Sequence, residues 1–151
     1  REKLNPSTIK KALSVLKNHE ILGIFPDGGT ENDFLGKAKN GAVYISTLAK
    51  APIVPMAIYG AETAWEGLFR GIRPRVFVNI GKPFGPHKIS GSKIEKQTKL
   101  QEIGLDMMCR IAALLPINRQ KTYKGDMRVK KYQKINNFIP KDHLYYKMKK
   151  K

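Results

Sequence analysis

Hydrophobic and polar residues follow distinct patterns along the chain, and each pattern predicts a type of element. Apolar residues at helical spacing between Asn5-Pro6 and Asn18 predict a first helix, because Asn is a good N-cap and Pro suits the first helical position. The apolar run at residues 21–25 ends in Pro-Asp-Gly-Gly, which predicts a buried strand stopped by a tight turn. His19 lies between them and is predicted to be a helix-end or loop residue rather than a catalyst, because nothing positions it as a base.

Further elements are predicted after this turn. Small and apolar residues predict a helix of about ten residues, introduced by residues 36–40. Strands are predicted at residues 53–59 and 75–81. Pro52 and Pro55 place the first of these strands at a sheet edge or a bulge, because proline cannot donate to a ladder.

The later part of the chain adds one long helix. Residues 60–65 are predicted to form a loop, and a Ser-x-x-Glu capping box at Ser92 opens a helix that ends at Pro116. The single cysteine, Cys109, lies in the apolar pattern of this helix and is predicted to be a buried thiol. The strand–helix–strand order of residues 21–59 predicts an α/β fold with parallel strands and a right-handed crossover.

The turn after residue 25 gathers polar groups at the end of an apolar run. Gly28 and Gly29 leave room for backbone N–H groups to face a ligand, and Asp27 and Thr30 add a carboxylate and a hydroxyl. Ligands of open α/β sheets bind at such strand ends. The alternative is a strand followed by an ordinary surface turn.

Three segments resemble the glycerolipid acyltransferase family, of the 1-acylglycerol-3-phosphate acyltransferase type. The family pattern is Phe-Pro-Glu-Gly-Thr-Arg-Ser, then Lys-x-Gly-Ala, then Val-Pro-x-x-Ile. Its counterparts are residues 25–31, 39–42 and 54–58, and the resemblance extends over residues 5–116. It implies a twisted, mostly parallel sheet flanked by helices.

The resemblance also implies an activity in phospholipid biosynthesis. Family members move an acyl group from acyl-CoA or acyl carrier protein to a lysophospholipid such as 1-acylglycerol-3-phosphate. No metal or cofactor is expected beyond this acyl thioester co-substrate. The residues expected at the substrate site are Phe25, Pro26, Asp27, Gly28, Gly29, Thr30, Lys37, Lys39, Val54 and Pro55.

The motif departs from the family at four positions. Asp27 stands where the family has Glu, and Gly29, Thr30 and Glu31 stand where it has Thr, Arg and Ser. The family's Arg is expected to hold the acceptor's phosphate, for which its bidentate fork is well suited. Here either Lys37 or Lys39 supplies that charge beside a helix N-terminus, or the acceptor is not a phosphate ester. The alternative is that both lysines are solvated.

The family's catalytic His-x-x-x-x-Asp motif has no counterpart in the chain. His19, His87 and His143 are followed five residues later by Ile24, Ser92 and Met148. No catalytic residue is therefore assigned within this chain, which is expected to be inactive alone. Because the chain also begins at Arg1, we expect it to be the C-terminal part of a longer enzyme, or a processed or partial chain.

Charge is unevenly distributed along the sequence. The net charge of the 151 residues is +17, and residues 121–151 carry eleven Lys or Arg and two acids. We expect an acyltransferase-like domain at residues 1–120 and a basic tail at residues 121–151. The tail interleaves tyrosines with lysines, shows no clear period, and is either solvated or suited to an anionic surface.

Two functions follow from these features. The first is an acyltransferase associated with the cytoplasmic face of a membrane, with a lysophospholipid acceptor, an acyl thioester donor and an anionic membrane surface as partners. The alternative is a non-catalytic basic module that binds an anionic membrane or nucleic acid. Nucleic acid is the less expected partner, because the sequence has no RNA- or DNA-binding motif.

Overall fold

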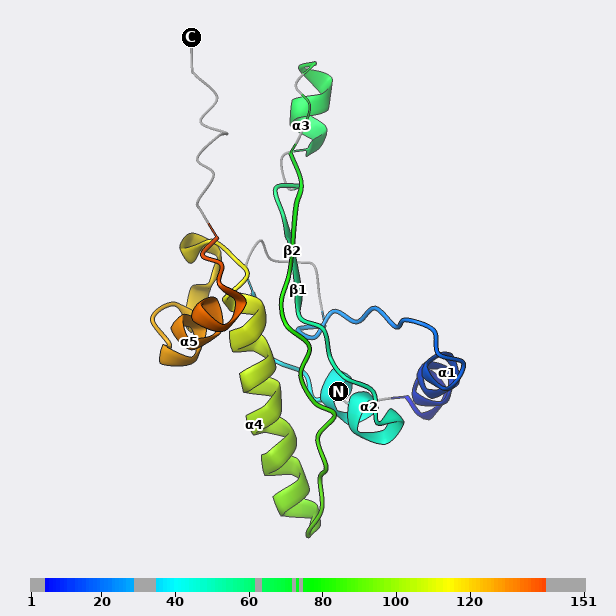
Figure 1. The fold of residues 1–151 in the computed structure, drawn as a ribbon. Helices are drawn as coiled ribbons and strands as arrows, with labels where there is room; N and C mark the ends of the chain where they lie inside the picture. Colours follow the sequence, from blue (N-terminus) through cyan, green and yellow to red (C-terminus); the bar gives the residue numbers. More distant parts are fainter. Residues whose placement is uncertain (1–4, 29–34, 62–63, 72, 74, 141–151) are drawn as a thin grey trace. The chain divides into compact units, whose positions relative to one another are not determined.

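The computed structural model describes residues 5–28, 35–61, 64–71, 73 and 75–140 of the chain. The elements, in order, are α1 (Pro6–Lys17), α2 (Gly41–Ala49), β1 (Met56–Tyr59), α3 (Ala64–Phe69), β2 (Phe77–Ile80), α4 (Lys93–Ala112), the 3-10 turns η1 (Ile117–Arg119) and η2 (Lys121–Tyr123), and α5 (Met127–Asn136) (Figure 1). They form two compact units. Within the described residues, the first unit holds α1, α2 and residues 82–108, and the second holds β1, α3, β2 and residues 109–140.

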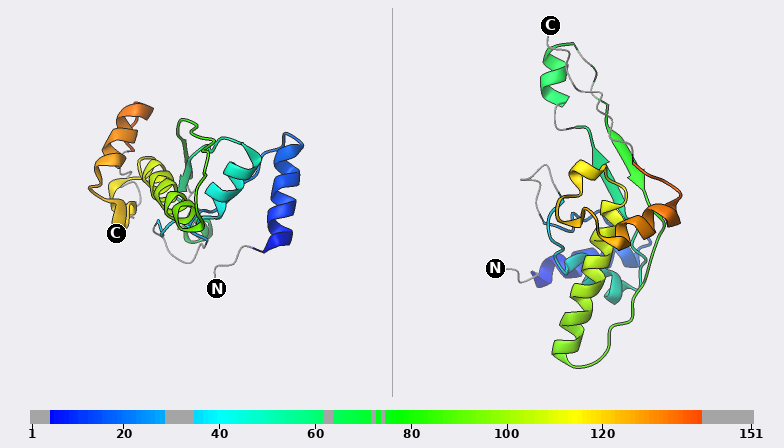
Figure 2. Two further views of the ribbon diagram at one scale, coloured as in Figure 1. Left: turned by 90° about the horizontal axis from the view of Figure 1, so that it is seen from below. Right: turned by 90° about the vertical axis from the view of Figure 1, so that its left-hand side faces the viewer.

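The first unit is made of helices whose ends follow their sequence signals. Asn5 caps α1 by accepting a hydrogen bond from the Ser7 amide at 3.0 Å. The Ser92 amide donates to the Glu95 carboxylate at 2.7 Å, and the Glu95 amide donates back to the Ser92 hydroxyl at 3.3 Å. Both predicted caps are therefore confirmed. α2 lies between α1 and the portion of α4 in this unit in two perpendicular views (Figures 1 and 2).

The second unit is built on an antiparallel pair of strands. β1 and β2 pair from Met56↔Ile80 to Tyr59↔Phe77, and the Tyr59 and Phe77 rings stack with centroids 5.2 Å apart. The Asn79 side-chain amide donates to the Leu114 carbonyl at 2.8 Å, which ties β2 to the chain that follows α4. The predicted strand at residues 53–59 is thus confirmed over its last four residues, and the one at residues 75–81 over its central four.

The two faces of this strand pair differ in exposure although both carry apolar residues. Ala57 and Tyr59 are buried on one face, whereas Met56, Ile58 and Val78 on the other are each about half exposed. Apolar residues on both faces are typical of strands that are covered on both sides, as in a sheet flanked by helices. The pattern is compatible with the predicted α/β architecture.

Residues 21–25 do not form the predicted buried strand. Their backbone is not assigned to a strand, Ile21 is 97% exposed and Phe25 is 71% exposed. An isolated strand leaves its amides and carbonyls without a ladder, and no strand among the described residues pairs with this segment. The predicted crossover to a parallel strand is therefore not observed. The mixture of helices and strands is confirmed, while the larger parallel sheet stays a prediction.

Two smaller sequence interpretations change as well. α3 begins at Ala64, so the predicted loop of residues 60–65 is wrong at its end. α5 lies within the basic tail, where no period was recognised. Cys109 is buried, as predicted, and His19 follows the end of α1 in a left-handed conformation with a φ of 61°.

Candidate functional site

The predicted tight turn is present at residues 25–28. The Gly28 amide donates to the Phe25 carbonyl at 3.1 Å, which closes a β-turn with Pro26 at its second position, where a fixed φ is favoured. The amide of Gly28, which was expected to face a ligand, is therefore used within the turn. Gly29 and Thr30, the next two predicted site residues, lie outside the described residues.

Two hydrogen bonds join this turn to the segment before α2. The Lys39 amide donates to the Pro26 carbonyl at 2.7 Å, and the Gly36 amide donates to the Asp27 carboxylate at 3.4 Å. Residues that are nine to thirteen positions apart in sequence are thus brought together. Asp27 has a defined orientation because its carboxylate is the acceptor of one of these bonds.

The side chain of Lys39 lies directly over the α-carbon of Gly28. A Cβ atom added at Gly28 would approach Cδ and Cε of Lys39 to 2.6 Å, and the lysine Nζ is closer still. Gly28 also has a φ of +74°, which favours glycine independently of this contact. Glycine at this position therefore allows both the turn and the close approach of a positive charge to it.

The N-terminus of α2 begins immediately after Lys39. Its N-cap, Asn40, makes no side-chain capping hydrogen bond, and the Tyr44 amide closes the first helical turn onto the Asn40 carbonyl. The amides of a helix's first turn have no intrahelical acceptor, and the helix dipole adds partial positive charge there. Backbone donors and the ammonium of Lys39 therefore occur together in this segment.

Two glycines outside the predicted site support this arrangement. A Cβ on Gly36 would lie 3.0 Å from Cβ of Asp27, and a Cβ on Gly104 of α4 would lie 3.3 Å from Cβ of Ala38. α4 therefore packs closely against the segment that carries Lys39. Gly104 interrupts a helical apolar pattern, and such an isolated glycine is a sequence signal for close packing.

The remaining predicted residues take no part in the hydrogen bonds of the turn given above. Lys37 is exposed, Val54 is 52% exposed, and Pro55 is buried immediately before β1. We define the turn site as Phe25–Gly28 together with Gly36, Lys39 and the N-terminus of α2. Of the two lysines predicted to hold a phosphate, only Lys39 is shown in contact with the turn.

The chemistry available at the turn site is that of anion binding. It offers one ammonium, helix N-terminal amides and a carboxylate held by a backbone donor. Across the described part of the chain, no three His, Cys, Asp or Glu residues are grouped as a metal site would need. None of the described helices combines the length and apolar character required to cross a bilayer.

Comparisons with known proteins show what these residues are similar to. Residues 1–59 fit the family model described as Acyltransferase. The chain is 39% identical over 83 residues to the 1-acyl-sn-glycerol-3-phosphate acyltransferase of Bacillus subtilis (strain 168), a stretch that covers 55% of this chain and 40% of that protein. The chain thus spans less than half the length of this relative. No solved structure matches the chain.

Proposed function

Because residues 1–59 fit the family model described as Acyltransferase, we propose that the turn site holds the acyl acceptor of a lipid acyltransferase. The observation that carries this proposal is the position of Lys39, which lies over Gly28 at the start of α2. The positive charge at the turn is thus provided by a residue nine positions beyond Thr30, which occupies the family's arginine position. The similarity to a 1-acyl-sn-glycerol-3-phosphate acyltransferase supports a lysophospholipid as the acceptor.

The proposed acceptor is a lysophospholipid with a phosphate and a free hydroxyl. Its phosphate would bind the Lys39 ammonium and the first amides of α2, which together offer a point charge and directional donors. Asp27 would hydrogen-bond within the acceptor pocket, with Phe25 and Pro26 beside it. Val54 and Pro55 are proposed to shape the wall of this pocket.

The proposed reaction is transfer from an acyl thioester, either acyl-CoA or acyl carrier protein. The acceptor's hydroxyl oxygen attacks the thioester carbonyl, a C–O ester bond forms, and the C–S bond breaks to release the thiol. The base that removes the hydroxyl proton is proposed to be the family's His-x-x-x-x-Asp motif, in sequence upstream of the turn. The residues of this chain bind and orient the acceptor. The acyl transfer is proposed to occur at the cytoplasmic face of a membrane.

The first test is acceptor-dependent thiol release from acyl-CoA. It is measured on this chain and on the longest natural form of the protein that contains it. We expect release by the longer form in the presence of lysophosphatidic acid and none by the 151 residues alone. Absence of release by both, across several acceptors and both donor types, would contradict the proposed function.

A second measurement tests the role of the phosphate. Lysophosphatidic acid and a monoacylglycerol of the same chain length differ in the phosphate alone. We expect Lys39→Ala to raise KM for lysophosphatidic acid and to leave KM for monoacylglycerol unchanged. Lys37→Ala is the matched control, because Lys37 is an exposed lysine two residues away. Equal effects on both acceptors would remove Lys39 from the phosphate site without affecting the assignment of acyl transfer.

The alternative function is a non-catalytic basic module. The net charge of +17 is the observation that favours it, because such a charge attracts anionic surfaces without any catalytic group. This alternative predicts binding to anionic partners together with no thiol release by the longer form.

A further inference from the structure

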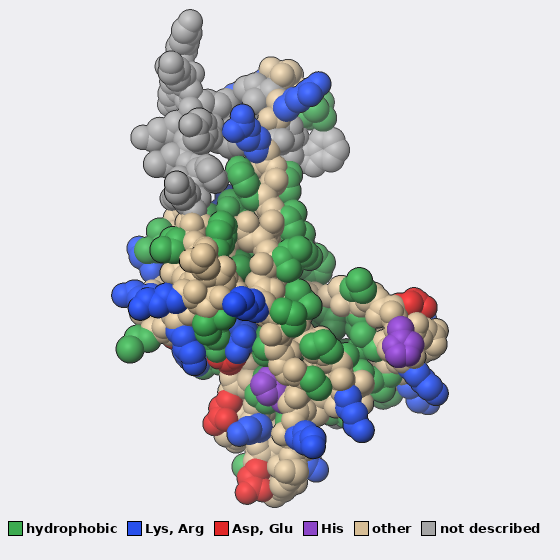
Figure 3. All heavy atoms as spheres, in the orientation of Figure 1, with side chains coloured by type: hydrophobic (Ala, Val, Ile, Leu, Met, Phe, Trp, Pro, Cys, Tyr) green, Lys and Arg blue, Asp and Glu red, His purple; other side chains and the backbone are tan. Residues whose placement is uncertain are grey.

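The second unit carries a surface in which lysines and large apolar side chains are interleaved. We define the α5 surface as the exposed side of α5 and the two residues that follow its C-cap. Its members are Met127, Lys130, Lys131, Lys134, Ile135, Phe138 and Ile139. Met127 is 83% exposed and Ile139 is 72% exposed. Figure 3 shows Lys and Arg side chains interspersed with hydrophobic ones over this part of the molecule.

The opposite side of α5 is buried and holds the helix in one orientation. Val129 and Tyr132 are almost fully buried, and the guanidinium of Arg110 lies 4.2 Å from the centre of the Tyr132 ring. At 100° per residue, Met127 and Lys134 project on the side away from Val129 and Tyr132. Lys131 borders this side, and its ammonium lies 5.9 Å from the centre of the Tyr132 ring.

The single acid of this region does not cancel the lysines' charge. Asp126 is the only Asp or Glu among residues 119–140. It caps α5 through the Arg128 amide at 2.8 Å, and its carboxylate pairs with the Arg128 guanidinium at 2.6 Å. Hydrogen bonds from Arg128 lower the pKa of Asp126 to about 2. The acid is thus balanced by the adjacent arginine, and the lysines set the field of the α5 surface.

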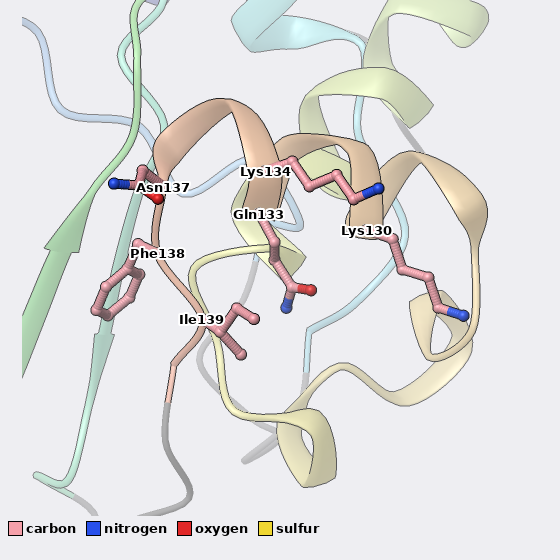
Figure 4. A pocket seen from close by; sticks show the side chains of 6 residues that line it. All are labelled: Lys130, Gln133, Lys134, Asn137, Phe138 and Ile139. Carbon is pink, nitrogen blue, oxygen red and sulfur yellow. The ribbon is translucent and has the colours of Figure 1, made fainter.

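The C-terminal end of α5 adds a hollow with apolar walls. Asn137 ends the helix with a φ of 50°, and the Phe138 amide donates to the Gln133 carbonyl at 3.1 Å. The hollow has a volume of about 540 Å³ and is lined by Lys130, Gln133, Lys134, Asn137, Phe138 and Ile139. Gln133 and Ile139 point toward one another across it, and Lys130 and Lys134 extend along one side of the helix (Figure 4).

We propose that the α5 surface docks on an anionic lipid bilayer. Its apolar side chains would enter the headgroup region, and the lysine stems would lie along that apolar layer with their ammonium groups at the lipid phosphates. The surface combines the two features that favour binding to an anionic membrane interface, which are positive charge and exposed large apolar side chains. This inference does not depend on the proposed acyl transfer.

The composition of the α5 surface favours a bilayer over nucleic acid. Nucleic-acid binding gains from phosphate contacts and from aromatic or arginine stacking on bases. Phe138 is the one aromatic member of the surface; the other apolar members, Met127, Ile135 and Ile139, provide no stacking surface, and the one arginine of the helix is paired with Asp126. Exposed aliphatic side chains among lysines are instead typical of helices that lie in a membrane interface.

The decisive experiment is co-sedimentation of this chain with lipid vesicles. Vesicles of phosphatidylcholine alone are compared with vesicles that also contain phosphatidylglycerol. We expect binding to the anionic vesicles, and we expect the triple variant Lys130→Gln/Lys131→Gln/Lys134→Gln to lower the partition coefficient about 100-fold, at roughly five-fold for each lysine. An unchanged partition coefficient in this variant would overturn the proposal.

A second triple variant provides a control of equal charge. Lys10, Lys11 and Lys17 are also exposed lysines, but none of the large apolar residues of α1 is exposed beside them. We expect Lys10→Gln/Lys11→Gln/Lys17→Gln to change the partition coefficient much less than the α5 variant. Equal losses in the two variants would show that net charge alone drives binding and would overturn the assigned surface. Circular dichroism checks that both variants remain folded.

Apolar substitutions separate a bilayer from other polyanions. The double variant Met127→Ser/Ile139→Ser leaves the charge unchanged. We expect it to weaken binding to anionic vesicles several-fold. We expect the affinity for duplex DNA, whatever its value in the parent chain, to stay the same. Loss of DNA binding with unaltered vesicle binding would contradict a bilayer as the partner. Because Cys109 is buried, a thiol-reactive fluorophore should react selectively with the cysteine of an Ile139→Cys variant. The emission of this fluorophore should shift to shorter wavelength when the protein binds anionic vesicles. No shift would contradict insertion.

Discussion

The turn site and the α5 surface both present lysines, but they present them in different ways. At the turn site one lysine is located by backbone hydrogen bonds and by the absence of a side chain on Gly28. On the α5 surface three lysines project from a helix face among exposed apolar side chains. The first arrangement suits a single phosphate in a fixed place, and the second suits an extended anionic surface whose charges are mobile.

The difference predicts that two kinds of substitution have separate consequences. A change in the position of Lys39 should affect the turn site even when the charge is kept. A change in the number of charges should affect the α5 surface even when the helix keeps its geometry. The turn site also lies within the residues that fit the Acyltransferase family, whereas α5 lies beyond them. Each region can thus be altered and its own property measured.

The largest expected effect is the loss of membrane binding without loss of acceptor recognition. In the longest natural form, Lys130→Gln/Lys131→Gln/Lys134→Gln should reduce the contribution of this surface to vesicle partition by about 100-fold. KM for a short-chain, water-soluble lysophosphatidic acid should be unchanged, because the phosphate is proposed to bind at the turn site. The two values are compared by co-sedimentation and by thiol release. A parallel rise in KM would break the separation between the regions.

The next largest effect is the converse. Lys39→Ala should raise KM for the same soluble acceptor about ten-fold, within the range for a lost charge-assisted hydrogen bond. Vesicle partition should be reduced far less than by the α5 variant, although both remove positive charge. Lys39→Arg should restore part of the affinity, because the guanidinium can also donate to phosphate. A variant that alters partition more than KM would move Lys39 from the turn site to the membrane contact.

The features that were predicted correctly from sequence depend on neighbouring residues. The Asn5 cap, the Ser92–Glu95 capping box and the Phe25–Gly28 turn each involve groups no more than three residues apart. Short sequence patterns are therefore enough to predict them: Asn-Pro, Ser-x-x-Glu and Pro-Asp-Gly. The roles of Pro26 and Asp27 as anchors of the turn site depend on partners farther away.

The features that the sequence could not settle depend on distant partners. Residues 21–25 are apolar enough for a strand, but a strand requires a neighbouring ladder and none is described beside them. Lys37 and Lys39 are two lysines of the same segment, and the sequence alone does not distinguish their roles. The hydrogen bond from the Lys39 amide to the Pro26 carbonyl distinguishes them in the structure. Helix α5 had a local signal in its Asp126 cap, but lysines and tyrosines with no recognised period concealed it.

A smaller effect tests whether charge number governs the α5 surface. Asp126→Asn keeps an N-cap side chain of similar quality and raises the net charge by one. We expect partition to anionic vesicles to stay equal or to rise by up to about five-fold, although the ion pair with Arg128 is lost. Co-sedimentation against the parent chain measures this change. A marked fall in partition would indicate that the geometry of the first turn of α5 matters more than its charge.

The same carboxylate gives the stability of α5 a defined pH dependence. The pKa of Asp126 is about 2 in the folded chain, whereas a carboxyl without these partners has a pKa of 3.8. The Asp126–Arg128 interaction therefore stabilises the fold fully above about pH 4. That contribution, less than about 1 kcal/mol for a partly exposed pair, is lost as the pH falls toward 2. Thermal unfolding of the parent and Asp126→Asn should therefore differ near neutral pH and converge in acid. A difference that persists at pH 2 would contradict this origin.

The smallest expected effect is a change of position at the turn site with no change of charge. Gly28→Ala introduces a Cβ at a φ of +74° and against the Lys39 side chain, which is flexible enough to move aside. Displacement of the ammonium should raise KM for the soluble acceptor about three-fold, and vesicle partition should not change. If the effect acts through Lys39, Gly28→Ala should add little to Lys39→Ala when the two are combined. Additive losses would show that Gly28 serves only the backbone of the turn. The turn site would then depend on the presence of the Lys39 charge rather than on its position, as the α5 surface depends on the presence of its lysine charges.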